Sequence, residues 1–206
     1  MTRSASDPRL VLATRNRHKV TELSRILKLP AGMTGVVGLD SFPEVPDVPE
    51  TGQTFADNAL LKARAVAAAT GLPAAADDSG LCVNALNGMP GIFSARWSGR
   101  HGDDAANLDL VLGQVADVPD GSRGAQFVCV AALALPGGGE WTMTGVLNGS
   151  LARAPRGNGG FGYDPIFVPD GMAVTTAELS PDSKDEISHR GRAFRALAPV
   201  IGAHLG

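Results

Sequence analysis

The 206-residue sequence predicts an α/β fold in which helices pack on a mixed β-sheet. In the first half of the chain, short apolar runs alternate with segments whose apolar residues recur at helical spacing, which is typical of strands in parallel pairing. In the second half, two longer apolar runs are separated by a short glycine-rich stretch, which indicates an antiparallel hairpin. Together these patterns favour one sheet with both kinds of pairing.

The N-terminal region predicts a strand, a helix and a second strand. Residues 9–14 form a short apolar run, and apolar residues over 20–27 then lie on one helical face. A second run covers residues 33–39 and precedes three prolines, within residues 43–49, that remove backbone donors. We expect an extended loop there, because such a stretch cannot form a helix.

The clearest helix signal covers residues 54–70. Thr54 and Asp57 have the spacing of a capping box, strong helix formers follow, and Gly71 provides the stop. The next apolar residues are typical of a strand, and we expect the motif ADDSGL, residues 76–81, to interrupt it.

The rest of the chain contains glycine-rich segments that predict loops, periodic segments that predict helices, and long apolar runs that predict strands. In chain order we expect a loop over 88–102, a helix over 103–116, strands over 125–135 and 140–151, a loop over 153–168 and a helix from about residue 188.

Composition and charge restrict the class of partner. The formal net charge of −3 and the scattered lysines and arginines provide no basic face for nucleic acid or anionic lipid. No apolar run approaches the roughly 18 residues of a membrane helix, and the first residues lack the apolar stretch of a signal peptide. Cys82 and Cys129 lie in apolar runs, which is typical of buried thiols in a reducing compartment. We therefore expect a cytoplasmic protein without a membrane or nucleic-acid partner.

The stretch TRNRHK, residues 14–19, lies between a predicted strand and a predicted helix. Free backbone N–H groups and the helix dipole favour an anion at such a position. Thr14 and Asn16 can donate hydrogen bonds from their side chains, and Lys19 adds a positive charge. The glycines and the Lys-Ser/Thr pair of a Walker loop are missing, and an ordinary capped helix start is the alternative.

The motif ADDSGL places Asp77 and Asp78 beside apolar strand residues. Burial and mutual repulsion would raise the pKa of a carboxyl group there unless donors or a cation compensate. Mg²⁺ would compensate, since it usually takes one or two carboxylates together with waters and phosphate oxygens. The alternative is a strand-end turn in which Gly80 adopts a left-handed conformation.

Single residues elsewhere offer weaker signals. Glu50 follows the prolines and Lys62 lies on the predicted helix, and both are ordinary surface residues when they are considered alone.

Glycines around Phe161 and Tyr163 would let a flat ligand approach the backbone, and an aromatic ring can stack on a nucleobase. Aromatic rings that fill the core are the alternative.

A third group of polar residues lies near the C-terminus. Lys184, His189 and Arg190 offer hydrogen-bond donors that suit phosphate or the acceptor-rich edge of a base. The start of a solvated helix is the alternative.

The order and spacing of these motifs are more specific than any one of them. They are T-x-N-x-x-K, ETG-x-TF-x-x-NA-x-x-KA, ADDSGL, GIFSARW, GFGYDPIF and K-x-x-ISHRG. On these motifs the sequence resembles the inosine triphosphate pyrophosphatase family, also called Ham1-like or noncanonical purine nucleoside triphosphate pyrophosphatases, from about residue 10 to the C-terminal helix. The resemblance implies a single domain over residues 1–206, with two lobes, a long central mixed sheet, a cleft between the lobes that holds the active site, and a homodimer.

The resemblance also implies a reaction, the Mg²⁺-dependent hydrolysis of ITP, dITP and XTP to the monophosphate and pyrophosphate, which removes deaminated purines from the nucleotide pool. Glu50 and Asp78 are implied as metal ligands, with Asp77 in support. Asp78 is further implied as the acceptor of a proton from the attacking water, and Ser79 as a substrate contact. The residues implied to bind the triphosphate are Thr14, Arg15, Asn16, Arg17, His18, Lys19 and Lys62. Those implied to bind the nucleoside are Phe161, Gly162, Tyr163, Asp164, Lys184, His189 and Arg190.

One position departs from the family pattern. Arg15 stands where the family usually has glycine, and this extra cation could contact phosphate or point to solvent. Two other functions stay open: a Maf-type pyrophosphatase for other modified nucleotides, and a nucleotide-binding sensor without hydrolysis. The adjacent carboxylates argue against the sensor, because a binder has little need of two acids beside a triphosphate.

Overall fold

The computed structural model describes residues 9–15, 17–27 and 35–205. The chain divides into two compact units, which we call unit 1 and unit 2. Unit 1 consists of Met1–Asp78, Val130–Gly145 and Arg190–Gly206, and unit 2 of Ser79–Cys129 and Val146–His189.

Helices and strands confirm the predicted α/β class. The strands are β1 (Arg9–Leu12), β2 (Gly35–Gly38), β3 (Ala74–Val83), β4 (Met89–Pro90), β5 (Gly124–Ala134), β6 (Glu140–Leu151) and β7 (Phe167–Pro169). The α-helices are α1 (Arg17–Ile26), α2 (Phe55–Thr70), α3 (Asp104–Gln114), α4 (Pro181–Ile187) and α5 (His189–Leu205).

The strands are hydrogen-bonded in the order β2-β1-β3-β5-β6-β7, and β4 pairs with β3. β1 runs parallel to both β2 and β3, whereas the pairs β3–β4 and β6–β7 are antiparallel. Parallel neighbours need a crossover connection, and the helix α1 supplies one between β1 and β2. The prediction of a mixed sheet is confirmed.

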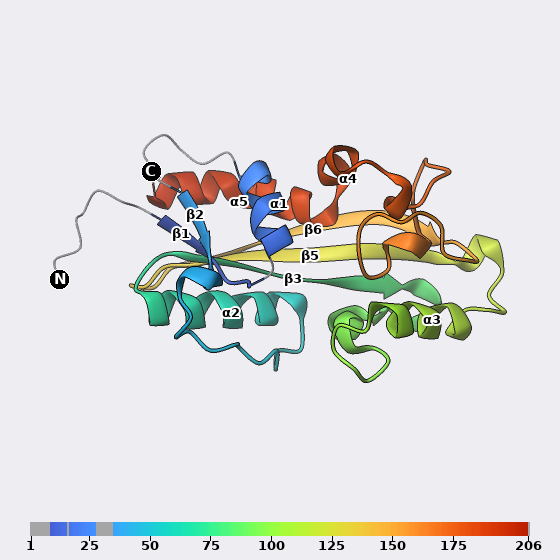
Figure 1. Ribbon diagram of the computed structural model, residues 1–206, viewed down its shortest axis with the longest axis horizontal. Helices are drawn as coiled ribbons and strands as arrows, with labels where there is room; N and C mark the ends of the chain where they lie inside the picture. The colour runs from blue at the N-terminus through green and yellow to red at the C-terminus, as the bar shows by residue number, and fades with distance from the viewer. Residues whose placement is uncertain (1–8, 16, 28–34, 206) are drawn as a thin grey trace. The chain divides into compact units, whose positions relative to one another are not determined.

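Helices cover both faces of the strands in unit 1. Figure 1 shows α2 on one face and α1 with α5 on the other. Ala59, Ala63 and Val66 of α2 pack in one core cluster with Ala74 and Ala76 of β3. Because both faces are covered, the strands consist of nearly continuous apolar runs rather than alternating ones.

The predicted start and stop of α2 are confirmed. The Thr54 side chain accepts a hydrogen bond from the Asp57 N–H, and the Asp57 carboxylate accepts one from the Thr54 N–H. Gly71 ends the helix in a left-handed conformation with φ of 65°.

Unit 2 has its own core and its own helices. Figure 1 shows α3 and α4 on opposite faces of its strands, and Leu81, Val111, Phe127 and Ile166 belong to one buried cluster. The sequence predicted a helix only from about residue 188. The structure places α4 before it, because the Ser180 side chain caps a helix that starts at a proline.

The expected interruption of the strand at the ADDSGL motif was wrong, and the alternative of a left-handed turn at Gly80 is not found either. β3 continues through the motif without interruption, and Gly80 lies within this strand rather than in a left-handed turn. A Cβ at Gly80 would lie 2.2 Å from the carbonyl oxygen of Gly91 and 2.5 Å from Ser94 Oγ. Glycine is therefore needed for close approach of the two segments.

The segment 88–102, which we expected to be a loop, contains regular secondary structure. It includes β4 and a 3₁₀ helix at Gly91–Arg96.

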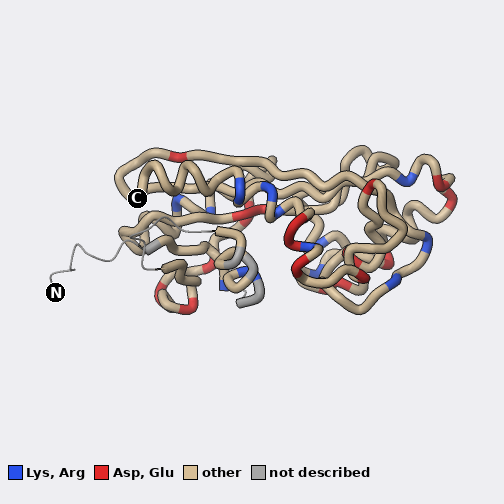
Figure 2. The backbone as a smooth tube through the Cα atoms, turned by 90° about the horizontal axis from the view of Figure 1, so that it is seen from above, with Lys and Arg blue, Asp and Glu red and all other residues tan. Residues whose placement is uncertain are grey.

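The distribution of charge and thiols agrees with the sequence. Figure 2 shows lysine and arginine positions interspersed with acidic ones along the trace of each unit. Cys82 and Cys129 are free thiols, half-buried and buried respectively. Within the described ranges, every helix is too short or too polar to cross a bilayer.

Replacing Gly80 with alanine should lower the free energy of unfolding by at least about 1–3 kcal/mol, because the added methyl group collides with backbone. Urea unfolding measures this loss. Gly113→Ala is the matched control: a Cβ at this exposed helical position meets no atom within 4 Å, so alanine should stabilise α3 slightly. Equal stability of the two variants would contradict the close approach at Gly80.

Candidate active site

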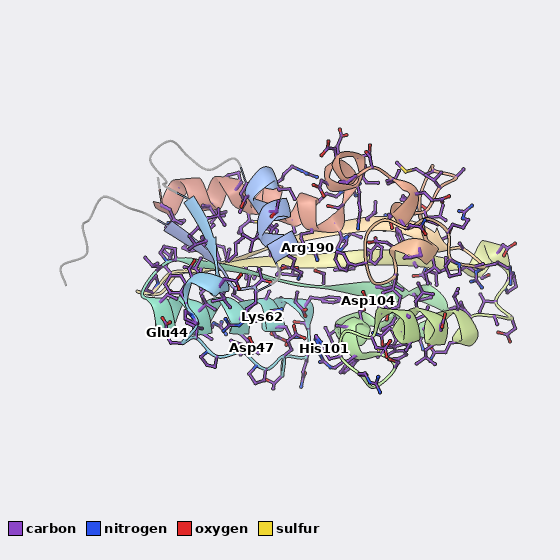
Figure 3. All side chains as sticks on the ribbon, in the orientation of Figure 1. Glu44, Asp47, Lys62, His101, Asp104 and Arg190 are labelled. Carbon is purple, nitrogen blue, oxygen red and sulfur yellow. The ribbon has the colours of Figure 1, made fainter. Side chains whose placement is uncertain are left out.

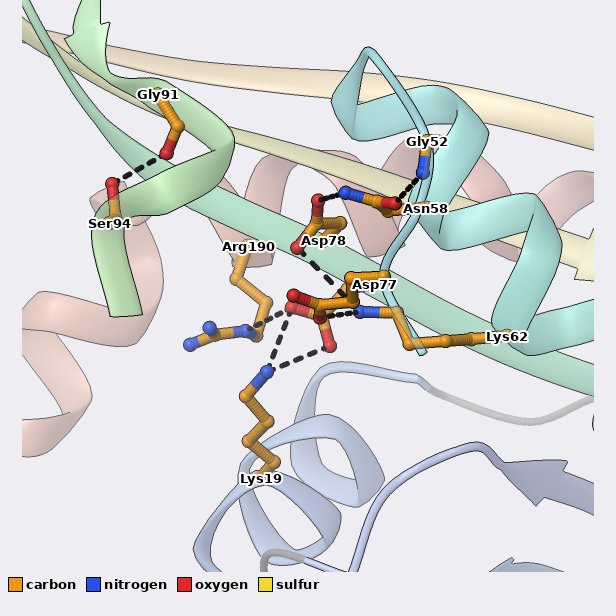
Figure 4. Close-up of polar contacts among 10 residues, drawn as sticks. Lys19, Gly52, Asn58, Lys62, Asp77, Asp78, Gly91, Ser94 and Arg190 are labelled. Atoms are coloured by element: carbon orange, nitrogen blue, oxygen red, sulfur yellow. Dashed lines mark hydrogen bonds and ion pairs between the residues drawn. The ribbon is translucent and has the colours of Figure 1, made fainter. Parts of the chain in front are cut away.

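Two carboxylates project from consecutive residues of β3. Ala74 and Ala76 pack against α2, and side chains alternate along a strand, so Asp78 points to the α2 face. Asp77 points to the opposite face, where α1 and α5 lie (Figures 1 and 4). Both acids are buried, with 6% and 7% of their surface exposed. Each acid therefore finds different partners.

Asp77 is held by two cations. Lys19 of α1 places its Nζ 3.2 Å from each carboxylate oxygen, and Arg190 of α5 donates from Nε to Oδ2 at 3.2 Å. Arg190 is itself only 5% exposed. The charge of Asp77 is thus compensated within unit 1, by two side chains that the sequence placed among the substrate contacts.

Asp78 has a different environment. Asn58 Nδ2 donates to its Oδ2 at 3.0 Å, and Lys62 Nζ lies 3.6 Å from its Oδ1 (Figure 4). Burial raises the pKa of Asp78 above its ordinary value, and the charges of Glu50 and Asp77 add to this effect. The opposing influence of Lys62 and Asn58 does not cancel it.

Lys62 joins two acidic side chains. Its Nζ lies 3.0 Å from Glu50 Oε1, in addition to its contact with Asp78. Burial, the largest single effect, lowers the pKa of Lys62, but attraction by Asp77, Asp78 and Glu50 outweighs it and raises this pKa overall. Lys62 is therefore a firmly charged ammonium shared by two carboxylates.

This donor set fits a divalent cation. Glu50 and Asp78 reach the same ammonium, so their carboxylates converge on one cationic position. Mg²⁺ binds hard oxygen donors and usually takes one or two carboxylates, with water and phosphate completing its shell. Burial keeps the pKa of Asp78 above its ordinary value despite the Lys62 ammonium, so a further cation would stabilise the ionised carboxylate. Within the described part of the chain, histidines, cysteines and acids form no cluster of three or more suited to hold a metal by itself.

No role was predicted for Asn58 from the sequence, although it belongs to the motif ETG-x-TF-x-x-NA-x-x-KA. It is fully buried, and its Oδ1 accepts a hydrogen bond from the Gly52 N–H at 2.8 Å while its amide donates to Asp78. It therefore links Asp78 to the segment that carries Glu50. A usable signal was its position four residues before Lys62, which places both side chains on one helical face.

The predicted phosphate-binding stretch lies at the start of α1, as the strand-loop-helix pattern indicated. Asn16 lies outside the described residues, and the side chains of Arg17 and His18 are also outside the description. Thr14 lies in the turn after β1, where its carbonyl oxygen accepts from the Leu39 N–H at 3.1 Å.

Arg15 contacts the segment that follows β2. Its guanidinium donates to the backbone carbonyls of Leu39 and Val45 and pairs with Asp47. Its role in phosphate binding stays a prediction.

In unit 2, Phe161 is an exposed aromatic ring on a fixed backbone. Its exposed fraction is 53%, and its N–H donates to Asp164 Oδ2 at 2.8 Å. Lys184 also binds this carboxylate and places its Nζ 5.1 Å from the centroid of the Phe161 ring. Thr176 Oγ1 donates to Asp164 Oδ1 at 2.8 Å. The buried Asp164 therefore organises the predicted base-binding residues.

Tyr163 is a buried core residue. The sequence offered this as the alternative to stacking on a base. It is 5% exposed, and its hydroxyl donates to the carbonyl oxygen of Ser94 at 2.8 Å. Burial, with a smaller contribution from Asp104, raises the pKa of this hydroxyl. Next to it, Gly162 has φ of 60° and donates from its N–H to Asp104 Oδ2 at 2.8 Å. Both contacts anchor the loop that presents Phe161.

The remaining predicted contacts have different neighbours. His189 stacks on Phe127, with ring centroids 4.9 Å apart and planes 15° from parallel. Lys184 lies over Phe161, whereas Arg190 belongs to the partners of Asp77. Ser79 lies half-buried in β3.

Comparisons with known proteins cover nearly the whole chain. A family model described as the Ham1 family matches residues 10–200. The dITP/XTP pyrophosphatase of Streptomyces coelicolor is 63% identical over 198 residues, which are 96% of this chain and 99% of that protein. The dITP/XTP pyrophosphatase of Nocardia farcinica is 59% identical over 197 residues, 95% of each chain.

Solved structures of similar chains show the same fold. The crystal structure of a nucleoside-triphosphatase / dITP/XTP pyrophosphatase from Mycobacterium abscessus has a TM-score of 0.77 and 56% identity, with 93% of this chain and 99% of that chain covered. The structure of a HAM1 protein from Coxiella burnetii has a TM-score of 0.85 and 43% identity, with 94% and 98% covered.

Proposed function

Because the chain belongs to the Ham1 family, we propose that it hydrolyses dITP, XTP and ITP to the monophosphate and pyrophosphate with Mg²⁺ as cofactor. It is a hydrolase of the nucleoside-triphosphate pyrophosphatase class. The observation that carries the proposal is the convergence of Glu50 and Asp78 on the Lys62 ammonium, beside the separately compensated Asp77. This arrangement provides a carboxylate with raised basicity next to a place for a cation.

Asp78 is the general base of this reaction. Asn58 fixes its Oδ2, while Oδ1 faces Lys62. Asp78 orients a water molecule and accepts its proton as the water oxygen attacks the α-phosphorus. The bond from that phosphorus to the bridging oxygen breaks, and pyrophosphate leaves with the electron pair. The raised pKa of Asp78 suits this role because it makes the carboxylate a stronger proton acceptor than an exposed one.

Charge compensation for the triphosphate comes from several sources in unit 1. Mg²⁺ held by Glu50 and Asp78 would neutralise phosphate charge and stabilise the pyrophosphate leaving group. Lys62 adds an ammonium beside these acids. Lys19 lies in the first turn of α1, and the backbone N–H groups and the dipole of a helix start generally attract an anion.

Base recognition involves the exposed Phe161 ring and the Lys184 ammonium in unit 2. A purine can stack on the ring, and Lys184, 5.1 Å from the ring centroid, can donate to a 6-oxo acceptor. Adenine carries an amino donor at that position, and the resulting mismatch costs about 1–3 kcal/mol for each unsatisfied group. Hypoxanthine and xanthine carry the oxygen and avoid this cost.

The resemblance noted from the sequence supports two further parts of the proposal. The enzyme would act as a homodimer, and it would work in the cytoplasm, where it removes deaminated purines before they enter nucleic acid.

A substrate panel tests the proposed reaction. We expect pyrophosphate release from dITP, XTP and ITP with kcat/KM about 10- to 100-fold above that for ATP, because the amino edge of adenine leaves donors unpaired. Chelation of Mg²⁺ by EDTA should abolish release. Equal rates on all substrates would contradict the 6-oxo selection. Faster turnover of dTTP would favour a Maf-type enzyme, and tight binding without release would favour a sensor.

Replacing Phe161 with alanine should raise KM for XTP about 5- to 100-fold and change kcat less, because the ring supplies stacking to the base. Steady-state kinetics of pyrophosphate release measure both constants. Phe93→Ala is the matched control, since Phe93 is 41% exposed in unit 2 and also has a cation, Arg96, over its ring. A KM that rises equally in both variants would argue against a specific base contact at Phe161.

A further inference from the structure

The segment between β2 and α2, residues 39–54, carries Glu50, and three of its residues lack a backbone donor. Pro43, Pro46 and Pro49 lie within it, and a proline nitrogen has no hydrogen to donate. Apart from short turns within the segment, its backbone groups are paired with other parts of the chain. Where it is fastened therefore decides where Glu50 lies.

Arg15 holds the first part of this segment. Its Nη1 donates to the carbonyl oxygen of Leu39 at 3.4 Å, and its Nη2 donates to the carbonyl oxygen of Val45. Its Nε lies 3.1 Å from Asp47 Oδ1. Val45 is 2% exposed and belongs to the core of unit 1, so the guanidinium ties a core position to the turn after β1.

The carbonyl contacts of Arg15 matter more than its ion pair. The Asp47 side chain is 89% exposed and lies on the segment between β2 and α2 (Figure 3), where solvent and salt screen the attraction. A charged donor gives stronger hydrogen bonds to carbonyl oxygens than a neutral donor does. The planar guanidinium reaches all three acceptors at once, which an ammonium cannot do in the same geometry.

The second part of the segment is held from α2. Asn58 Oδ1 accepts from the Gly52 N–H at 2.8 Å, and the Asp57 carboxylate accepts from the next two backbone N–H groups at 3.2 and 3.0 Å. Glu50 lies between this attachment and the one made by Arg15, and its carboxylate meets Lys62. The position of Glu50 is thus defined from both sides.

We propose that Arg15 is a positioning residue, which fastens residues 39–47 to the turn after β1 and thereby fixes the Glu50 carboxylate for the metal. The role of Glu50 in this inference rests on the proposed function, whereas the attachment itself does not. The Leu39 N–H also donates to the Thr14 carbonyl oxygen at 3.1 Å. The turn that begins the predicted phosphate-binding stretch and the segment that carries Glu50 are therefore linked.

Hydrogen–deuterium exchange of the metal-free protein tests the attachment. We expect peptides that cover residues 39–52 to exchange about tenfold faster in Arg15→Ala, because charge-assisted hydrogen bonds are lost, and less so in Arg15→Lys. Arg64→Ala is the control. Arg64 is also an exposed arginine of unit 1 paired with an acid, Glu140, at 2.6 Å, but it lies on α2. Wild-type exchange in Arg15→Ala would overturn the attachment.

The Mg²⁺ dependence of pyrophosphate release tests the functional part. In Arg15→Ala the half-saturating Mg²⁺ concentration should rise about 3- to 10-fold, because the Glu50 carboxylate is no longer held for the metal. Asp47→Asn should resemble the wild type in this concentration and in kcat, because its ion pair is screened. A general loss of folded enzyme would instead lower kcat and leave the half-saturating concentration unchanged.

The outcomes separate this inference from the proposed function. Faster exchange with an unchanged Mg²⁺ requirement would overturn the positioning role of Arg15. If the wild type releases no pyrophosphate from any nucleotide, the proposed function fails, and the exchange result still decides whether Arg15 holds the segment.

Discussion

Two acidic side chains at consecutive positions of a buried strand impose the constraint on which unit 1 depends. A carboxylate that loses its water must gain hydrogen-bond donors or a cation. Strand geometry sends Asp77 and Asp78 to opposite faces, so each has to be satisfied by different helices. Two cations from α1 and α5 satisfy Asp77, whereas an amide and a shared ammonium from α2 serve Asp78. The helices therefore fix the electrostatics of the strand as well as its packing.

The unequal compensation of the two acids explains how one strand can supply both support and chemistry. Asp77 has two cationic partners, Lys19 and Arg190. Asp78 shares Lys62 with Glu50. Burial raises the pKa of Asp78, and the charges of Glu50 and Asp77 add to this effect. A carboxylate in this state can bind a divalent ion or accept a proton. The proposed reaction needs both capacities.

Much of the fold followed from the sequence because periodicity and capping are local properties. The acids in β3 could also be identified, since their residue type conflicts with their apolar neighbours. Other features depend on partners that only folding brings together. In the sequence, Gly80 can indicate either a turn or a place where two segments pack closely. The neighbouring Ser94, fourteen residues later in the chain, shows that close packing is the reason. The contacts of Arg15 lie 24 to 32 positions away. Asn58 resembles any helical asparagine until Asp78 is placed beside it.

The central claim is that Asp78 performs chemistry while Asp77 supports the structure. The most direct test measures kcat for dITP in Asp78→Asn, with the free energy of unfolding of the same sample. Asparagine removes the base and weakens the metal ligand, so kcat should fall at least about 100-fold, while stability stays within about 1 kcal/mol because a desolvated charge is lost. In Asp77→Asn, stability should instead fall by about 3–5 kcal/mol, since buried cations lose their partner. Wild-type turnover in Asp78→Asn would contradict the assignment.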